Sequence, residues 1–142
     1  MSSLYAIVNG VLSTPYATSK AAVEAFGRAL RVELAPAGIA VGVAYFGFID
    51  TKLVQDSLAK PGIEELRSSL PRFISDPVPV DRAGKAVAKG VATRAPRVTA
   101  PGWMRATLPF RGLMQYLDGR MVRDAKIARA IAAAEAAQRA ES

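Results

Sequence analysis

The sequence contains neither cysteine nor histidine among its 142 residues. The absence of cysteine excludes disulfides, thiolate metal sites and a cysteine nucleophile, and it fits a reducing, cytoplasmic location. The absence of histidine removes the commonest metal ligand and the usual general base near neutral pH. Any acid–base chemistry must therefore use Tyr, Lys, Asp or Glu, and we expect no metal site.

Long apolar runs are also missing. No apolar segment reaches the roughly 20 residues that a membrane-spanning helix needs. The N-terminus lacks the basic region, apolar core and small-residue cleavage site of a secretory signal. With 51% hydrophobic and 22% charged residues, the composition suits a soluble globular protein with a sizeable core.

Positive charge is concentrated towards the C-terminus. The net charge is +7, and the residues from Arg94 onward include nine basic and four acidic side chains, which is a surplus of five. This region could serve an anionic partner, and we consider peripheral contact with a membrane surface. The arginines are scattered among alanines without interleaved aromatic residues, so we expect no nucleic-acid partner.

The hydrophobic pattern of the first 46 residues predicts a helix followed by a buried strand. Ser13 and Pro15 can begin a helix, which the alanine-rich stretch 16–34 continues. The apolar positions at helical spacing are expected to face the core: Ala22, Val23, Phe26, Leu30 and Leu34. After Pro36 and Gly38, the apolar run 39–46 predicts a strand covered on both faces, as in a parallel sheet.

Four further elements are expected after residue 50: helices over 50–59, 63–70 and 80–94, and a short strand over 97–100. The third of these helices has a candidate buried stripe of Ala83, Val87 and Val91. The stretch 60–79 holds four prolines and is interpreted as a mobile cover over a site.

The sequence pattern beyond residue 101 predicts helices and leaves their roles open. The segment 103–117 mixes aromatic and aliphatic residues with arginine at amphipathic spacing. It could pack on the core, line a substrate pocket or lie on a membrane surface. The segment 121–140 is an alanine-rich helix candidate that we expect to fray into solvent.

Tyr16 and Lys20 are the clearest candidates for catalytic residues. On a helix, residues four apart share a face, so the phenol and the ammonium would point into the same space. A nearby positive charge favours the ionised form of a phenol, which prepares it for general acid–base catalysis. An ordinary pair on a helix surface would show the same spacing. Tyr5 and Tyr45 are expected to be packing residues.

The surrounding residues resemble the short-chain dehydrogenase/reductase family. Its Y-x-x-x-K signature matches Tyr16 and Lys20, and Ser3 lies where the family has its catalytic serine. The family's P-G-x-x-x-T turn matches at Gly47 and Thr51, although Phe46 replaces the proline. The resemblance covers most of residues 1–101. It implies a partial Rossmann-like α/β domain with a doubly wound parallel sheet, followed by a basic helical extension over 102–142.

The resemblance also implies roles for individual residues. Tyr16 would exchange a proton with the substrate oxygen while hydride moves between substrate and nicotinamide. Lys20 would favour the ionised phenol and hydrogen-bond the nicotinamide ribose, and Ser3 would hold the substrate carbonyl or hydroxyl. The turn from Gly47 through Ile49 and the Thr51 hydroxyl would contact the nicotinamide amide and the phosphates.

The family's glycine-rich dinucleotide-binding turn, G-x-x-x-G-x-G, has no counterpart in this sequence. The resemblance therefore implies a C-terminal catalytic half that lacks the N-terminal dinucleotide-binding half. We expect a truncated product, a mis-assigned start or a fragment, inactive as this chain alone. The whole protein would be a homo-oligomeric oxidoreductase that uses NAD or NADP on a hydroxyl or carbonyl of a lipophilic small molecule.

Plainer explanations exist for these features. Ser3 could belong to a frayed N-terminus, and Thr51 could simply cap a helix. At the level of the whole chain, the alternative is a non-catalytic remnant or a protein-interaction module, in which exposed apolar surface drives association.

Overall fold

In a computed structural model, the backbone is described for residues 1–8, 10–68 and 70–141. Side chains are described at these positions except 64, 65, 68, 111, 114, 115, 117, 120 and 141. The elements, with short 3-10 helices marked η, are β1 (Ser2–Ser3), η1 (Leu4–Ala6), α1 (Thr14–Leu34), η2 (Ala35–Ala37), β2 (Val43–Phe46), α2 (Lys52–Leu58), α3 (Ile63–Ser68), α4 (Arg72–Ser75), α5 (Val80–Ala92), β3 (Arg97–Ala100), α6 (Met104–Thr107), η3 (Leu108–Phe110), α7 (Arg111–Met121) and α8 (Ala125–Glu141).

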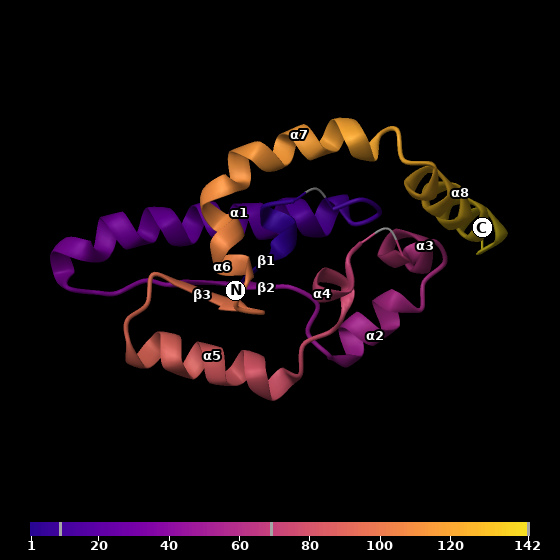
Figure 1. Cartoon of the computed structure of the whole chain (residues 1–142). Helices are drawn as coiled ribbons and strands as arrows, with labels where there is room; N and C mark the ends of the chain where they lie inside the picture. The colour runs from indigo at the N-terminus through magenta and orange to yellow at the C-terminus, as the bar shows by residue number, and fades with distance from the viewer. Residues whose placement is uncertain (9, 69, 142) are drawn as a thin grey trace.

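The strands form a three-stranded parallel sheet in the order β1-β2-β3. Ser3 pairs with Phe46 at the carboxyl end of β1, and Val43 pairs with Arg97 at the amino end of β3. Helix α1 lies on one face of the sheet and α5 on the other (Figure 1). The predicted α/β class and the partial Rossmann-like arrangement are therefore confirmed.

The central strand is shorter than the sequence suggested. It begins at Val43, whereas the apolar run from Ile39 was expected to be extended throughout. The two neighbours of β2 supply only two and four residues for pairing, so the residues before Val43 have no strand beside them. Ile39 is consequently exposed.

Helix α1 begins and ends where the sequence predicted, but its buried face is different. Phe26, expected in the core, is 65% exposed, whereas Glu24 and Gly27 are buried. Gly27 lies so close to β2 that an added Cβ would be 2.7 Å from Cγ2 of Val43. The smallest residue of the helix therefore decides which side approaches the sheet, and the larger apolar side chains turn outward.

The N-terminus of α1 also differs in detail from the prediction. Ser13 occupies the N-cap position, but its side chain makes no capping hydrogen bond within the described part of the chain. Its carbonyl instead accepts from the N–H of Ala17 at 2.9 Å. The helix ends through η2 at Gly38, whose φ of 71° is the left-handed conformation that glycine adopts readily.

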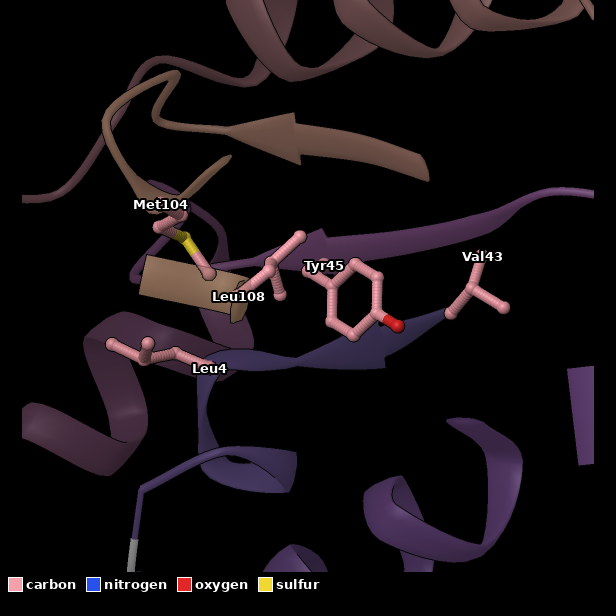
Figure 2. Packing of buried hydrophobic residues seen from close by; sticks show 5 residues of the cluster. All are labelled: Leu4, Val43, Tyr45, Met104 and Leu108. Carbon is pink, nitrogen blue, oxygen red and sulfur yellow. The ribbon is translucent and has the colours of Figure 1, made fainter. Parts of the chain in front are cut away.

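The core is divided between the two faces of the sheet. On the α1 side, side chains of β2 meet residues of η1, α6 and η3 (Figure 2); this cluster contains Leu4, Val43, Tyr45, Met104 and Leu108. On the α5 side a second cluster contains Ile49, Val78, Ala83 and Ala100. The packing role expected for Tyr45 is confirmed, since its side chain is buried in the first cluster.

The C-terminal segment is packed rather than frayed. Ile127 and Ala130 of α8 form a third buried cluster with Leu66 of α3. Met104 and Leu108 place the beginning of the 103–117 segment in the core, one of the three interpretations left open above; the side chains at 111, 114, 115 and 117 lie outside the described residues. In the predicted helix over 63–70, Ser69 is likewise outside the description.

No helix within residues 1–8, 10–68 and 70–141 has the length and apolar character needed to cross a membrane. Peripheral membrane contact through the basic C-terminal region stays a prediction.

Two glycines of α5 provide a matched test of its packing. Gly90 is buried, and an added Cβ would collide with Cγ2 of Val98 on β3, whereas Gly84 is exposed with nothing within 4 Å of such an atom. We expect Gly90→Ala to lower the free energy of unfolding by about 1–3 kcal/mol through overpacking. Gly84→Ala should raise it by about 0.5–1 kcal/mol through helix propensity. Urea unfolding measures both changes, and equal effects would contradict the described packing.

Candidate active site

The first turns of α1 hold Tyr16 and Lys20 together. Nζ of Lys20 lies 5.2 Å from the centroid of the Tyr16 ring, which is within the range of a cation–π interaction. Tyr16 is 43% exposed and Lys20 is half-buried, so the phenol is open to a ligand. The expectation that the two side chains share a face is confirmed.

Ser3 lies at the carboxyl end of β1 and is not part of a frayed terminus. Ser3 is 7% exposed, and it pairs with Phe46 of β2 in the parallel sheet. The hydroxyl accepts a hydrogen bond from the N–H of Tyr5 at 3.3 Å and donates to the carbonyl of Phe46 at 3.4 Å. The distance to the Phe46 carbonyl exceeds the usual O–H···O range of about 2.5–3.0 Å, so this hydrogen bond is weak.

The turn after β2 divides the residues predicted to bind the cofactor. The N–H of Gly47 donates to the carbonyl of Ala100 at 2.9 Å, and Gly47 lines the cavity described below. Ile49 points its side chain into the α5-side core, beside Val78. Thr51 is the N-cap of α2, and its hydroxyl accepts from the N–H of Val54 at 3.3 Å. The helix-cap explanation of Thr51 is therefore confirmed, which does not decide whether it also contacts a cofactor.

A cavity of about 370 Å³ brings Ser3, Tyr16 and Gly47 together at the carboxyl ends of β1 and β2. In open α/β sheets, ligands bind at this end of the strands. The remaining walls are largely apolar and come from η1, the turn before α1, the turn after β2, α2 and the beginning of α3; they include Tyr5, Leu12, Phe48, Leu53, Leu58 and Ile63. The predicted cover over 60–79 contributes Lys60 and Ile63 to these walls. Lys20, Ile49 and Thr51 do not line the cavity.

Tyr5 is the site residue that the sequence reasoning missed. Its ring makes edge-to-face contacts with Tyr16, at 6.0 Å between centroids, and with Phe48, at 6.4 Å. Such aromatic pairs are worth about 0.5–1.5 kcal/mol beyond their area burial. Tyr5 therefore braces the ring of Tyr16 from the cavity wall. The sequence contained no signal for this, because the contact joins η1 to a helix that begins eight residues later.

Burial raises the pKa of the Tyr5 phenol above its ordinary value, and the neighbouring Tyr16 raises it further. Tyr5 therefore stays protonated at neutral pH and can only act as a neutral hydroxyl. No group of three acidic, histidine or cysteine side chains that could hold a metal ion occurs in the described part of the chain.

Comparison with protein families identifies a match over the first part of the chain. Residues 1–62 match the family model of the short chain dehydrogenases. A search of curated proteins finds no match, and a search of solved structures finds none. Residues 1–62 are therefore similar to a short chain dehydrogenase segment, which supports the sequence resemblance. The assignment of this segment to the C-terminal half of such a protein stays a prediction.

The pKa of Tyr5 offers a test of the electrostatic effect of Tyr16 on its neighbour. We expect the Tyr5 phenol to ionise above pH 10. Tyr16→Phe should lower this pKa, because the electrostatic contribution of the Tyr16 hydroxyl is lost. The pKa should nevertheless remain above the ordinary value, because burial is the larger cause. NMR of ring-labelled tyrosine over a pH series, with the signal assigned by Tyr5→Phe, measures the shift.

The matched control is Tyr116→Phe, which removes an exposed phenol that does not line the cavity. This variant should leave the Tyr5 titration unchanged. An unchanged Tyr5 pKa in Tyr16→Phe would show that the Tyr16 hydroxyl does not raise the Tyr5 pKa.

Proposed function

We propose that this chain, whose first 62 residues match the short chain dehydrogenase family, provides the substrate-binding and proton-transfer site of an NAD- or NADP-dependent oxidoreductase. The proposed substrate is an apolar small molecule with a hydroxyl or carbonyl group. The observation behind this proposal is that Ser3 and Tyr16 line the same largely apolar cavity. The ammonium of Lys20 lies over the Tyr16 ring.

The two hydroxyl groups suit a carbonyl–alcohol interconversion. A substrate oxygen between Ser3 and Tyr16 could accept a hydrogen bond from each, which would stabilise negative charge developing on that oxygen. The Tyr16 hydroxyl would transfer its proton to this oxygen during reduction and remove it during oxidation. The ammonium of Lys20 would stabilise the phenolate that remains, by Coulomb attraction at short range. The Ser3 hydroxyl could donate to the substrate oxygen instead, because its hydrogen bond to the Phe46 carbonyl is long.

The cavity also fits the nicotinamide end of a dinucleotide at Gly47. A Cβ at this position would lie 3.1 Å from Cδ of Pro101 and 3.6 Å from Sδ of Met104, so the packing behind the turn favours glycine. Without a side chain, the backbone of Gly47 can approach a planar ring closely. When bound, nicotinamide supplies the hydride donor or acceptor. We propose that Gly47 and the backbone of Ile49 border this ring, and that the Thr51 hydroxyl and Lys20 contact the phosphate and ribose groups.

The shape and lining of the cavity support the substrate class. A volume of about 370 Å³ is at the lower end of small-molecule sites, which are about 300–1,000 Å³. Leu53 and Leu58 of α2 and Ile63 of α3 offer apolar contacts away from the two hydroxyl groups. A compact aliphatic or aromatic alcohol or ketone fits this distribution better than a sugar or an amino acid.

Because the glycine-rich dinucleotide-binding turn has no counterpart in this sequence, the test joins the chain to a dinucleotide-binding half of the same family. Cofactor binding and turnover of this joined protein are separate readouts. NADH and NADPH binding is measured by nicotinamide fluorescence, and oxidation of a panel of apolar secondary alcohols by nicotinamide absorbance. We expect Tyr16→Phe to reduce turnover at least about 100-fold while leaving cofactor affinity nearly unchanged, because only the proton-transferring oxygen is lost. Tyr116→Phe makes the same chemical change at an exposed position outside the cavity and should leave turnover intact. Equal, measurable turnover by the joined protein with and without Tyr16→Phe would refute the proposed role.

A second candidate function is a protein-interaction module, and the outer face of α1 favours it. Phe26 and Val32 of this helix are 65% and 74% exposed. We propose that this face joins two copies of the chain, as a homo-oligomer would require.

Sedimentation velocity tests this association. Phe26→Ser should shift the distribution towards the monomer, because burial of a phenylalanine stabilises an interface by about 1.5–3 kcal/mol. Phe110→Ser, at a phenylalanine of η3 that is also exposed, is the control and should leave the distribution unchanged. A monomeric unmodified chain would rule this function out.

A further inference from the structure

Another cavity, lined mainly by charged side chains, lies at the opposite end of the sheet from the candidate active site. It has a volume of about 280 Å³ and is lined by Glu24, Arg28, Arg31, Tyr45, Arg97 and Leu108. Arg97 begins β3, whereas Ser3 and Gly47 lie at the carboxyl ends of β1 and β2. The two cavities lie at different ends of the strands and share no lining residue.

The arginines meet there because of how α1 approaches the sheet. Gly27 allows the helix backbone to lie close to Val43, which brings the neighbouring Arg28 and Arg31 to the amino end of β2. Arg97 pairs with Val43 in the parallel register, so both side chains are on the α1 face. Residues far apart in the sequence thus place three guanidinium groups around one cavity.

Hydrogen bonds and ion pairs within the described part of the chain engage these guanidinium groups only in part. Arg31 donates from Nε to the carbonyl of Val41 at 2.8 Å and from Nη2 to the carbonyl of Pro96, which leaves Nη1 without a hydrogen bond in the described part of the chain. Arg28 makes a long ion pair with Glu24, at 3.8 Å. Arg97 makes no ion pair with any described residue. One carboxylate faces three cations, so the side chains that line the cavity carry a net charge of +2.

We propose that this cavity binds a small dianionic oxyanion of the phosphate-monoester type. Guanidinium groups bind phosphate through paired N–H···O bonds, and such charge-assisted bonds are shorter and stronger than neutral ones. The net charge of the lining matches a dianion, and Arg31, fixed by two backbone carbonyls, is held in position for it. The cavity volume admits a phosphate group with a small organic substituent. Binding here would be independent of the proposed redox site.

The experiment titrates the full chain with inorganic phosphate in isothermal calorimetry at constant ionic strength. We expect saturable binding at one site, and a loss of affinity of at least about tenfold in both Arg28→Gln and Arg97→Gln. Arg82→Gln is the matched control: it removes the same charge from an exposed position of α5 outside the cavity and should leave the affinity unchanged. Thermal unfolding without phosphate checks that each variant remains folded.

A second arm separates the two sources of a phosphate monoester. Flotation with vesicles of phosphatidylcholine containing phosphatidic acid, compared with phosphatidylcholine alone, tests a lipid headgroup. Vesicle binding that is lost in Arg97→Gln and retained in Arg82→Gln would assign the site to a lipid phosphate, whereas binding of free phosphate alone would assign it to a soluble compound. The proposal is overturned if neither probe binds, or if Arg82→Gln weakens binding as much as Arg97→Gln, since binding would then follow net charge only.

Discussion

The parallel pairing of β2 with strands on both sides determines where Ser3, Gly47 and Arg97 lie. Through β1 it brings the N-terminal Ser3 beside the turn that contains Gly47. Through β3 it places Arg97 next to Val43 at the other end of the same strand. Because all three strands run in the same direction, hydroxyl groups and a glycine turn collect at the carboxyl end and arginines at the amino end. The backbone hydrogen bonds of a strand only four residues long thus hold two chemically different cavities apart.

The second constraint is the close approach of α1 to this sheet. A glycine at position 27 faces Val43, and Ser2 donates a hydrogen bond from its hydroxyl to the carbonyl of Lys20 at 2.8 Å. These contacts fix both the height and the rotation of the helix. Its rotation sets Tyr16 towards the first cavity, Arg28 and Arg31 towards the second, and Phe26 towards solvent. A helix with a large residue at position 27 would have to move away from β2, and both cavities would change together.

The elements that local sequence signals predict agree well with the structure. The helix over 14–34 and its end at Gly38 follow from a proline and a glycine, which act within a few positions. The strand expected over 97–100 lies at Arg97–Ala100. Helices α2 and α5 were likewise expected close to their observed bounds. The prediction was wrong where an outcome depends on a distant partner. The strand expected from Ile39 starts at Val43 because its neighbours are short, and the C-terminal helix packs on α3 because Leu66 offers it an apolar surface.

Local sequence is enough to predict the pairing of Tyr16 with Lys20, because two residues four apart on a helix share a face. It also determined the α/β class and the family resemblance of the first segment. Long-range contacts of the folded chain bring Ser3 and Gly47 to one cavity with Tyr16 and place Tyr5 against the Tyr16 ring. They also bring arginines from α1 and β3 to a second cavity. These arrangements depend on strand register and on how closely a glycine lets a helix approach a sheet. Both are set by contacts between residues tens of positions apart, which no local pattern records.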